Sequence, residues 1–395
     1  MRCRVRRYRV STRSLVAIVA VVTATASFAQ SVPKKQKLNR RQREELPRLM
    51  RIVDAVAESD LPGGDAWLKW SSHFLRAPDG KTYVPFTLTI DEADAGFDSI
   101  GMYIRVADRP EVAEGMEDAK LDDTSGGAVG EGPISVPERQ FGQRGAPTAG
   151  ENSAIAASIA ASLRQKGPLK LPFEDVHFLE PMRPDPDGPW IVRRALAVAP
   201  GEYDLFIVVR EFTDGKRSDG TPPRTAVLKQ VLSVPDLSGD VFTTSSVVLA
   251  ERVEALPTRL SDVEQLERPY ALGNVEITPM AQSVFHPLDE LSLVFFAYNM
   301  ASAGGMPDVT VQYRFYKVGI QDQLIVAGQP QLFDASTLPA GFDVDAVGDQ
   351  LPINIAVPLK SFPLGPYRLE ILVTDNLADV AVTRNVTFLV EDAGE

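Results

Sequence analysis

Two stretches of the chain, residues 201–211 and 365–375, alternate apolar and polar side chains in nearly the same order. Each begins with glycine, has tyrosine, leucine, isoleucine and valine at matching positions, and ends on an acidic residue. Because successive side chains of a strand point to opposite faces, this alternation predicts two strands that each bury one face. A second pair of similar segments, 226–231 and 381–386, follows after a turn. The repeat predicts a closing hairpin in each of two β-sandwich domains.

The tyrosines of the repeat have a recognisable position. Tyr203 and Tyr367 each lie two residues after the glycine that opens the strand, Gly201 or Gly365. This spacing resembles the tyrosine corner of immunoglobulin-like sandwiches, in which the phenol hydroxyl bonds a backbone group a few residues upstream. We interpret all four residues as structural. The predicted fold class is all-β with minor helices, formed by two immunoglobulin-like (Ig-like) antiparallel β-sandwich domains in tandem.

Short apolar runs bounded by turn signals extend the strand pattern over most of the chain. The first sandwich is expected over residues 63–250 and the second over 269–395, joined by a charged, strandless linker at 251–268. Residues 107–152 are rich in Gly, Pro, Glu, Asp and Ser and lack the apolar side chains that a core needs, which predicts a disordered insertion. Apolar residues at helical spacing then predict a helix at 153–165.

The first sixty residues contain two further elements. Residues 1–29 place six arginines ahead of an apolar core and a small-x-small site, the pattern of a cleavable secretory signal peptide. Residues 30–62 form a basic arm that runs into a helix, with Pro47 expected in its first turn. We interpret this helix as packed on the first sandwich. The alternative is an arm that contacts an anionic polymer or docks a partner.

Charge and cysteine content narrow the function classes. The net charge is −12, and removal of the six signal arginines leaves −18. A chain with this charge repels nucleic acid and anionic lipid. The single cysteine, Cys3, lies in the signal, so the mature chain is expected to have no disulfide and no cysteine nucleophile. The mature protein is expected to lack a transmembrane segment and to be periplasmic or secreted.

Residues suited to chemistry are few and scattered. His73, His177 and His286 are each more than a hundred residues from the next and show no metal-binding spacing. The acidic residues around Asp187 and Asp345 do not fit a calcium-binding loop, although distant loops can pool carboxylates. We assign no catalytic residue, no metal site and no cofactor, and a calcium site built from several loops stays open.

The tryptophans offer a second kind of site. Trp67 and Trp70 lie three apart in a predicted strand and therefore point to opposite faces. We place Trp70 inward, and Trp67 and His73 outward, which makes Trp67 a candidate ligand contact. Pro85, in the strand that follows, predicts an edge strand or a bulge.

Three strings carry a resemblance to known proteins: residues 74–86, 199–205 and 240–250. They look like secreted bacterial proteins that occur with von Willebrand A-related (VWFA-related) and GWxTD-type envelope proteins, and the likeness spans most of residues 60–390. The resemblance implies an exported tandem β-sandwich protein and brings no known activity. Neither a GWxTD string nor the Asp-x-Ser-x-Ser metal motif of the A domain is present, so their chemistry is not carried over.

We therefore expect an extracytoplasmic, non-catalytic binding or structural protein within an envelope assembly, with an envelope protein or glycan as partner. The alternative is a carbohydrate-active hydrolase or a carbohydrate-binding protein that uses loop carboxylates beside Trp67 or Trp190 of the first domain. The ligand and the oligomeric state stay open at the level of sequence.

Overall fold

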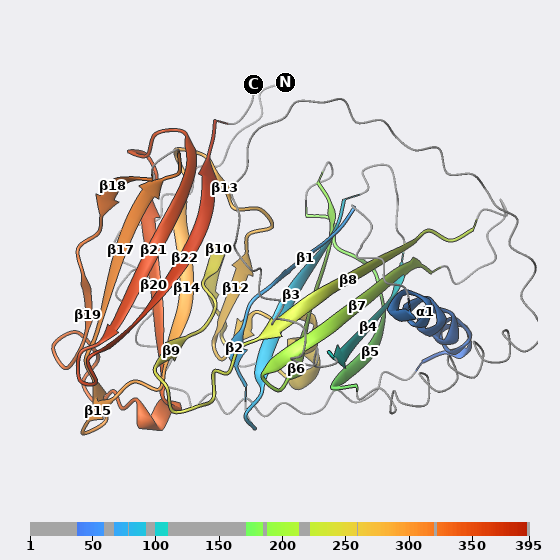
Figure 1. The fold of residues 1–395 in the computed structure, drawn as a ribbon, viewed down its shortest axis with the longest axis horizontal. Helices are drawn as coiled ribbons and strands as arrows, with labels where there is room; N and C mark the ends of the chain where they lie inside the picture. The colour runs from blue at the N-terminus through green and yellow to red at the C-terminus, as the bar shows by residue number, and fades with distance from the viewer. Residues whose placement is uncertain are drawn as a thin grey trace, which may run out of the picture.

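The computed structural model describes residues 38–58, 67–77, 79–91, 99–109, 171–184, 188–212, 222–258, 260–319 and 322–392. The predicted fold class is confirmed, because these residues form two antiparallel β-sandwiches in tandem. Figure 1 shows a helix at one side of the molecule, followed by the sheets of the first sandwich and then those of the second. The predicted signal at 1–29, the predicted helix at 153–165 and all but the first three residues of the predicted insertion lie outside the described residues.

The first sandwich has an inner sheet, which faces the second sandwich, and an outer sheet, which faces the helix. The first inner sheet has β3 in its centre, between β6 and the pair β1 and β2; its strands are β1 (Leu68–Ser72), β2 (Leu75–Arg76), β3 (Thr82–Ile90) and β6 (Trp190–Val198). The first outer sheet has the order β5 (Phe173–Leu179), β4 (Ile100–Asp108), β7 (Gly201–Glu211), β8 (Thr225–Val234). Between them lies the first core, which includes Phe86, Leu88, Ile104 and Leu205.

The second sandwich repeats this arrangement. Its inner sheet has the order β11 (Ala271–Leu272), β12 (Val275–Pro279), β10 (Val248–Ala255), β14 (Glu290–Tyr298), β20 (Gln350–Pro358), with β9 (Thr243–Thr244) also paired to β14. Its outer sheet has the order β13 (Val284–Phe285), β22 (Val380–Val390), β21 (Gly365–Asp375), β17 (Val309–Lys317), β18 (Gln323–Ala327), with β19 (Gln331–Phe333) also paired to β17.

Three short elements complete the second sandwich: the small hairpin β15 (Ser302–Ala303) and β16 (Met306–Pro307), and the 3₁₀ turn η2 (Asp345–Val347). The second core, between the two sheets, includes Leu293, Phe295, Tyr313 and Leu369.

The repeat noted in the sequence forms the hairpin β7–β8 in one outer sheet and the hairpin β21–β22 in the other. The Tyr203 hydroxyl donates a hydrogen bond to the carbonyl of Ala199 (2.9 Å), and the Tyr367 hydroxyl donates to the carbonyl of Pro363 (2.5 Å). Gly201 has φ = +153°, and a Cβ atom there would lie 3.2 Å from the Tyr203 hydroxyl oxygen. The glycine therefore gives the corner tyrosine room to fold back.

The acidic residue that ends each repeat strand is buried. Asp375 is fully buried, and its carboxylate accepts hydrogen bonds from the backbone N–H of Ala301 (2.7 Å) and from two N–H groups of the following turn. Glu211 accepts hydrogen bonds from the backbone and the guanidinium of Arg224. The acidic residue at the end of each repeat strand therefore accepts hydrogen bonds from groups of the chain next to its hairpin.

When the two hairpins are compared by their cross-strand pairing, the second strands align one residue away from the match of 226–231 with 381–386 seen in the sequence. Ile207 pairs with Leu228 in the first sandwich, whereas the equivalent Ile371 pairs with Arg384 in the second. Since a shift of one residue moves every side chain to the other face, the sequence echo of 226–231 and 381–386 does not mark equivalent positions. Arg384 occupies the inward position that a buried leucine fills in the first copy.

Removal of one corner hydroxyl is expected to weaken the fold measurably. Tyr203→Phe and Tyr367→Phe should each lower the free energy of unfolding by about 1–2 kcal/mol, because each leaves a carbonyl without its donor. Denaturant unfolding of the purified protein measures this. Tyr316→Phe, on the outer face of β17, is the control and should stay within about 0.5 kcal/mol of wild type. Corner variants as stable as the control would rule out the contribution.

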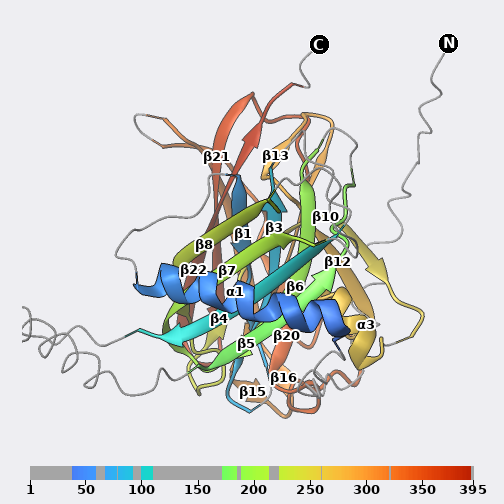
Figure 2. The same ribbon diagram turned by 90° about the vertical axis from the view of Figure 1, so that its right-hand side faces the viewer.

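Helix α1 (Arg40–Glu58) covers the outer face of the first outer sheet, as Figure 2 shows. Asn39 caps its start, where its side chain accepts from the Gln42 N–H and the Gln42 side chain accepts from the Asn39 N–H. Leu49 and Val53 are fully buried against the sheet. The helix is therefore packed on the first sandwich, which is the interpretation that the sequence favoured.

The expected position of Pro47 was wrong, since it lies inside α1 and not in its first turn. Pro47 is exposed, so the carbonyl that loses its N–H partner faces water. Two ion pairs also hold the helix to the sheet: Glu45 with Arg210, and Asp54 with Arg105 (2.6 Å). Docking onto the sheet outweighs the cost of the interior proline.

The stretch expected to be a strandless linker, 251–268, is structured. Strand β10 continues to Ala255 and pairs with β12, and helix α3 (Asp262–Glu267) follows behind a capping box of Ser261 and Glu264. Both β9 and β10 precede residue 269 in sequence but belong to the second inner sheet. The charged residues of β10 concealed the strand, because beyond a register shift after Ala250 most of their side chains point into solvent.

Pro85 was expected on an edge strand or at a bulge, and it lies instead in the central strand β3. The neighbouring chain is interrupted opposite it, between the end of β1 at Ser72 and the start of β2 at Leu75. The Pro85 carbonyl still accepts a hydrogen bond from the His73 N–H (3.0 Å) on that side. Because no strand residue pairs with Pro85 on that side, the N–H group that proline lacks is not needed for a hydrogen bond between strands.

A third core joins the two sandwiches, where the first inner sheet packs on the second inner sheet. We call it the junction core; its buried members are Leu75, Ala77, Tyr83, Val248, Ala250, Tyr270, Leu272, Ile277 and Val294. Its two tyrosines reach across in opposite directions. The Tyr83 hydroxyl donates to the carbonyl of Pro269 (2.8 Å), and the Tyr270 hydroxyl donates to the carbonyl of Pro85 (3.3 Å).

Candidate functional site

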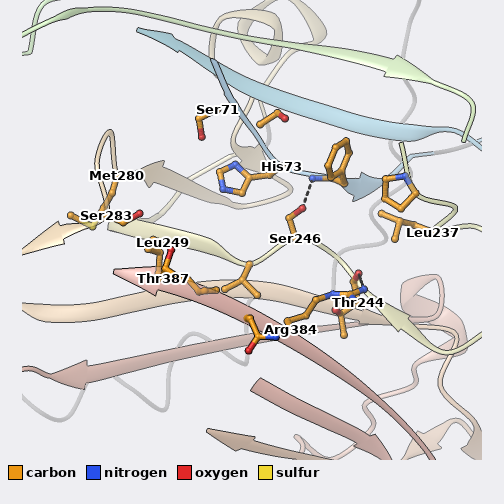
Figure 3. Close-up of a pocket in the computed structure, with 16 residues that line it drawn as sticks. Ser71, His73, Leu237, Thr244, Ser246, Leu249, Met280, Ser283, Arg384 and Thr387 are labelled. Atoms are coloured by element: carbon orange, nitrogen blue, oxygen red, sulfur yellow. Dashed lines mark hydrogen bonds between the residues drawn. The ribbon is translucent and has the colours of Figure 1, made fainter. Parts of the chain in front are cut away.

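A cavity of about 580 Å³ lies beside the junction core, with residues of both sandwiches in its wall (Figure 3). Its volume is within the range of about 300–1,000 Å³ that is usual for small-molecule sites. The first sandwich contributes Ser71, Ser72, His73 and Phe74 from β1 and the residues after it; the second contributes Thr244 and Ser246 from the β9–β10 region and Arg384 from β22. We call this space the junction cavity.

His73 faces the second sandwich, so the side chain that the sequence places on the outward side of its strand is covered by Tyr270 and not exposed to solvent. Its Nδ1 atom is 2.9 Å from the Tyr270 hydroxyl oxygen. Burial lowers the pKa of His73 to about 4, so the imidazole is neutral at pH 7. At this point the chain between β1 and β2 approaches the second sandwich. The Phe74 N–H donates a hydrogen bond to the Ser246 hydroxyl (2.9 Å) of that sandwich (Figure 3).

Arg384 is the one positively charged group among the described residues that line the junction cavity. Its Nη2 atom donates to the Thr243 hydroxyl (3.3 Å) and to the Thr244 carbonyl (3.1 Å). Burial lowers the pKa of its guanidinium. Sequence inspection missed this residue, although an arginine between Val382 and Val386 at inward spacing is an available signal.

The tryptophans singled out in the sequence do not line the junction cavity. Trp67 packs against the first core, as do Trp70 and Trp190, so its predicted outward orientation was wrong. Trp67 comes just before β1, and strand alternation therefore does not set its direction. Trp70 stacks on Phe86 with ring centroids 4.1 Å apart. No role of Trp67 in ligand contact follows from this packing.

The described lining of the junction cavity contains no aspartate or glutamate. Glycoside hydrolysis ordinarily requires two carboxyl groups on either side of the scissile bond. The junction cavity therefore does not supply the chemistry of the hydrolase alternative. Its hydroxyl, amide and guanidinium groups are suited to binding through hydrogen bonds.

The other residues considered for metal chemistry are separate from one another. In the part of the chain that the structure describes, no three His, Cys, Asp or Glu side chains gather as a metal site would require. His177 contacts Asp175 (3.2 Å), and His286 accepts a backbone N–H within its own turn. Asp343 accepts the N–H of Asp345 (3.0 Å), and residues 185–187 lie outside the described ranges.

Comparison with known proteins gives little further information. No family model and no curated protein matches the chain. Among solved structures, it is similar to trypsin-activated α2-macroglobulin from Escherichia coli (12% identity, TM-score 0.20), covering 84% of this chain and 17% of that one. Salmonella α2-macroglobulin reacted with methylamine gives 12% identity, TM-score 0.18 and the same coverages of 84% and 17%.

The native conformation of the E. coli protein gives 11% identity and TM-score 0.18, with coverages of 85% and 16%. The chain thus spans less than a fifth of the length of these proteins, and TM-scores this low support no inference about it. Among the helices of the described residues, none is long and apolar enough to cross a membrane.

Proposed function

We propose that this chain is an exported, non-catalytic binding protein whose two sandwiches act as one rigid body and hold a ligand or partner where they meet. The observation that carries the proposal is the junction core, with nine buried apolar residues between the sandwiches. Contacts between domains of one chain are usually small and polar, and they permit relative motion. A buried apolar contact of this kind fixes the orientation of the two halves.

Arg76 of β2 adds a polar clamp to the junction core. Its guanidinium donates to the carbonyls of Leu237 (2.9 Å) and Gly348 (3.0 Å) and to the side chain of Asn299. It also lies over the Tyr298 ring, 4.4 Å from the ring centroid. A planar guanidinium that binds several acceptors and stacks on a ring at once loses part of these contacts when one sandwich rotates slightly relative to the other. The clamp therefore supports a preorganised binding unit, which lowers the entropic cost of holding a partner.

Export and an envelope partner are supported by the sequence. The signal pattern at 1–29 favours secretion, and the resemblance to proteins found with von Willebrand A-related and GWxTD-type proteins favours an envelope assembly. A net charge of −18 after signal removal disfavours nucleic acid as the partner. We therefore propose an envelope protein or glycan as the binding partner.

Two measurements on the tagged full chain in its native cells test the proposal. Fractionation followed by N-terminal sequencing is expected to find the protein outside the cytoplasm, beginning near Gln30. Cross-linking in the intact envelope is expected to yield one reproducible adduct. An uncleaved cytoplasmic chain, or recovery of uncross-linked monomer alone, would contradict the proposal.

A further inference from the structure

We propose that the junction cavity binds a small organic monoanion, a carboxylate attached to an apolar body, and that Arg384 is its counter-charge. This inference deepens the binding role proposed above and rests on it.

The first observation is that Arg384 has no protein counter-charge. Arg105 and Arg210 pair with the acids Asp54 and Glu45, and Arg76, which has no acid partner, donates from all three of its guanidinium nitrogens to protein acceptors. Within the described ranges, no carboxylate lies within 4.0 Å of the Arg384 guanidinium. Only its Nη2 atom makes hydrogen bonds to protein, so Nε and Nη1 keep donors for a ligand. A partly desolvated cation of this kind is stabilised by an anion that enters from solvent.

The second observation is the position of Arg384 in the repeat. Ile207 and Ile371 are equivalent, and their cross-strand partners are Leu228 and Arg384. The first sandwich fills this inward position with a leucine that is 7% exposed and belongs to the first core. Apolar packing is thus sufficient at this point of the fold. The arginine in the second copy is not required by the architecture, which points to a role in binding.

The third observation is an unpartnered hydroxyl beside the guanidinium. Thr244 is 1% exposed and lines the junction cavity, and its Oγ1 atom has no hydrogen-bond partner among the described residues. Its backbone carbonyl accepts from Arg384 Nη2 (3.1 Å), so this residue lies beside the cation (Figure 3). A buried hydroxyl without a partner costs free energy. Donation to a bound carboxylate oxygen would remove that cost.

The composition of the wall indicates the class of ligand. Among the described lining residues there is one arginine and no lysine, and His73 is neutral at pH 7, so the cavity supplies a single positive charge. A single guanidinium matches a monoanion, and its planar fork matches a carboxylate. Phe74, Leu249 and Met280 add apolar surface, which suits an apolar body on the same molecule.

Calorimetric titration of the purified signal-free chain tests the inference with matched probes. The probes are N-acetylphenylalanine, its C-terminal amide, a short peptide that ends in phenylalanine with a free carboxylate, and inorganic phosphate. We expect a carboxylate probe to bind about tenfold or more tightly than the amide, since a charged hydrogen-bonded pair is lost with the amide. Binding of both carboxylates indicates a free acid as the source, and binding of the peptide alone indicates a chain terminus.

Variants connect the binding to the site. Arg384→Gln should weaken carboxylate binding about tenfold or more, whereas Arg314→Gln, an arginine of the same sheet that pairs with Glu370, should bind like wild type. Ser283→Phe narrows the junction cavity from an exposed position and should also weaken binding. This second variant keeps the test valid if thermal melting shows that Arg384→Gln does not fold.

Several results would overturn the inference: equal binding of acid and amide, tighter binding of phosphate, no binding of any probe, or unchanged affinity in folded Arg384→Gln and Ser283→Phe. Its failure is distinguishable from failure of the proposed function. A cross-linked envelope partner without carboxylate binding refutes only the carboxylate site, and carboxylate binding by a chain that remains in the cytoplasm refutes only the exported role.

Discussion

Replacing Tyr270 by alanine is expected to lower the free energy of unfolding by about 3–5 kcal/mol, the usual cost of deleting a large buried ring. Tyr270 is 2% exposed in the junction core. Its hydroxyl also contacts the His73 ring and the Pro85 carbonyl, which both lose a partner. Because this core holds the sandwiches together, the variant should also loosen their relative orientation. Denaturant unfolding and small-angle X-ray scattering measure the two effects.

Tyr270→Phe is the matched variant for this experiment. It keeps the ring and removes only the hydroxyl, so the expected loss is about 1–3 kcal/mol with an unchanged scattering profile. Tyr316→Phe, on the outer face of β17, again serves as the control. If Tyr270→Ala unfolds at the wild-type midpoint, or scatters like wild type despite its lower stability, the junction core does not fix the two halves.

Acidification is expected to destabilise the protein through His73. The pKa of His73 is lowered to about 4 by burial, against about 6.5 in an unfolded chain. Between these values the unfolded state binds more protons than the folded state, so stability rises with pH. The contribution of His73 is fully present above pH 6.5 and falls by about 3 kcal/mol as the pH drops to 4.

Unfolding free energies measured between pH 7.5 and pH 4 isolate this contribution. His73→Phe cannot take up the proton, so its unfolding free energy should fall by about 3 kcal/mol less over this interval than that of wild type. This amount follows from the difference of about two and a half units between the folded and unfolded pKa of His73. A wild-type slope in His73→Phe would show that the imidazole is not held neutral between the sandwiches.

The fold was predictable wherever local alternation decides which side chains are buried. The repeated alternation predicted both hairpins, and the spacing of Tyr203 and Tyr367 after glycine predicted the corner bonds, for which the structure gives both hydroxyls an upstream carbonyl. Helix α1 was predictable for the same reason, because Leu49 and Val53 recur at helical spacing. These elements depend on patterns within about ten residues.

The predictions failed where the burial of a residue depends on the other sandwich. His73 has the sequence context of an exposed strand residue, and the packing of Tyr270 from the other sandwich against it takes it partly out of solvent. The charged end of β10 was read as a linker because its pairing partner β12 follows twenty residues later. Arg384 was overlooked for the same reason, since its environment combines β22 with Thr243 and Thr244, which are 140 residues away.

The reciprocal bonds of Tyr83 and Tyr270 bear on how such a chain can change over evolutionary time. Each tyrosine finds its acceptor in the opposite half, Pro269 for one and Pro85 for the other. If a gene lost or exchanged either half, the remaining half would have a tyrosine hydroxyl without its acceptor and an apolar face exposed to water. The two halves are therefore constrained to be inherited and to diverge as a pair, unlike modules that recombine freely.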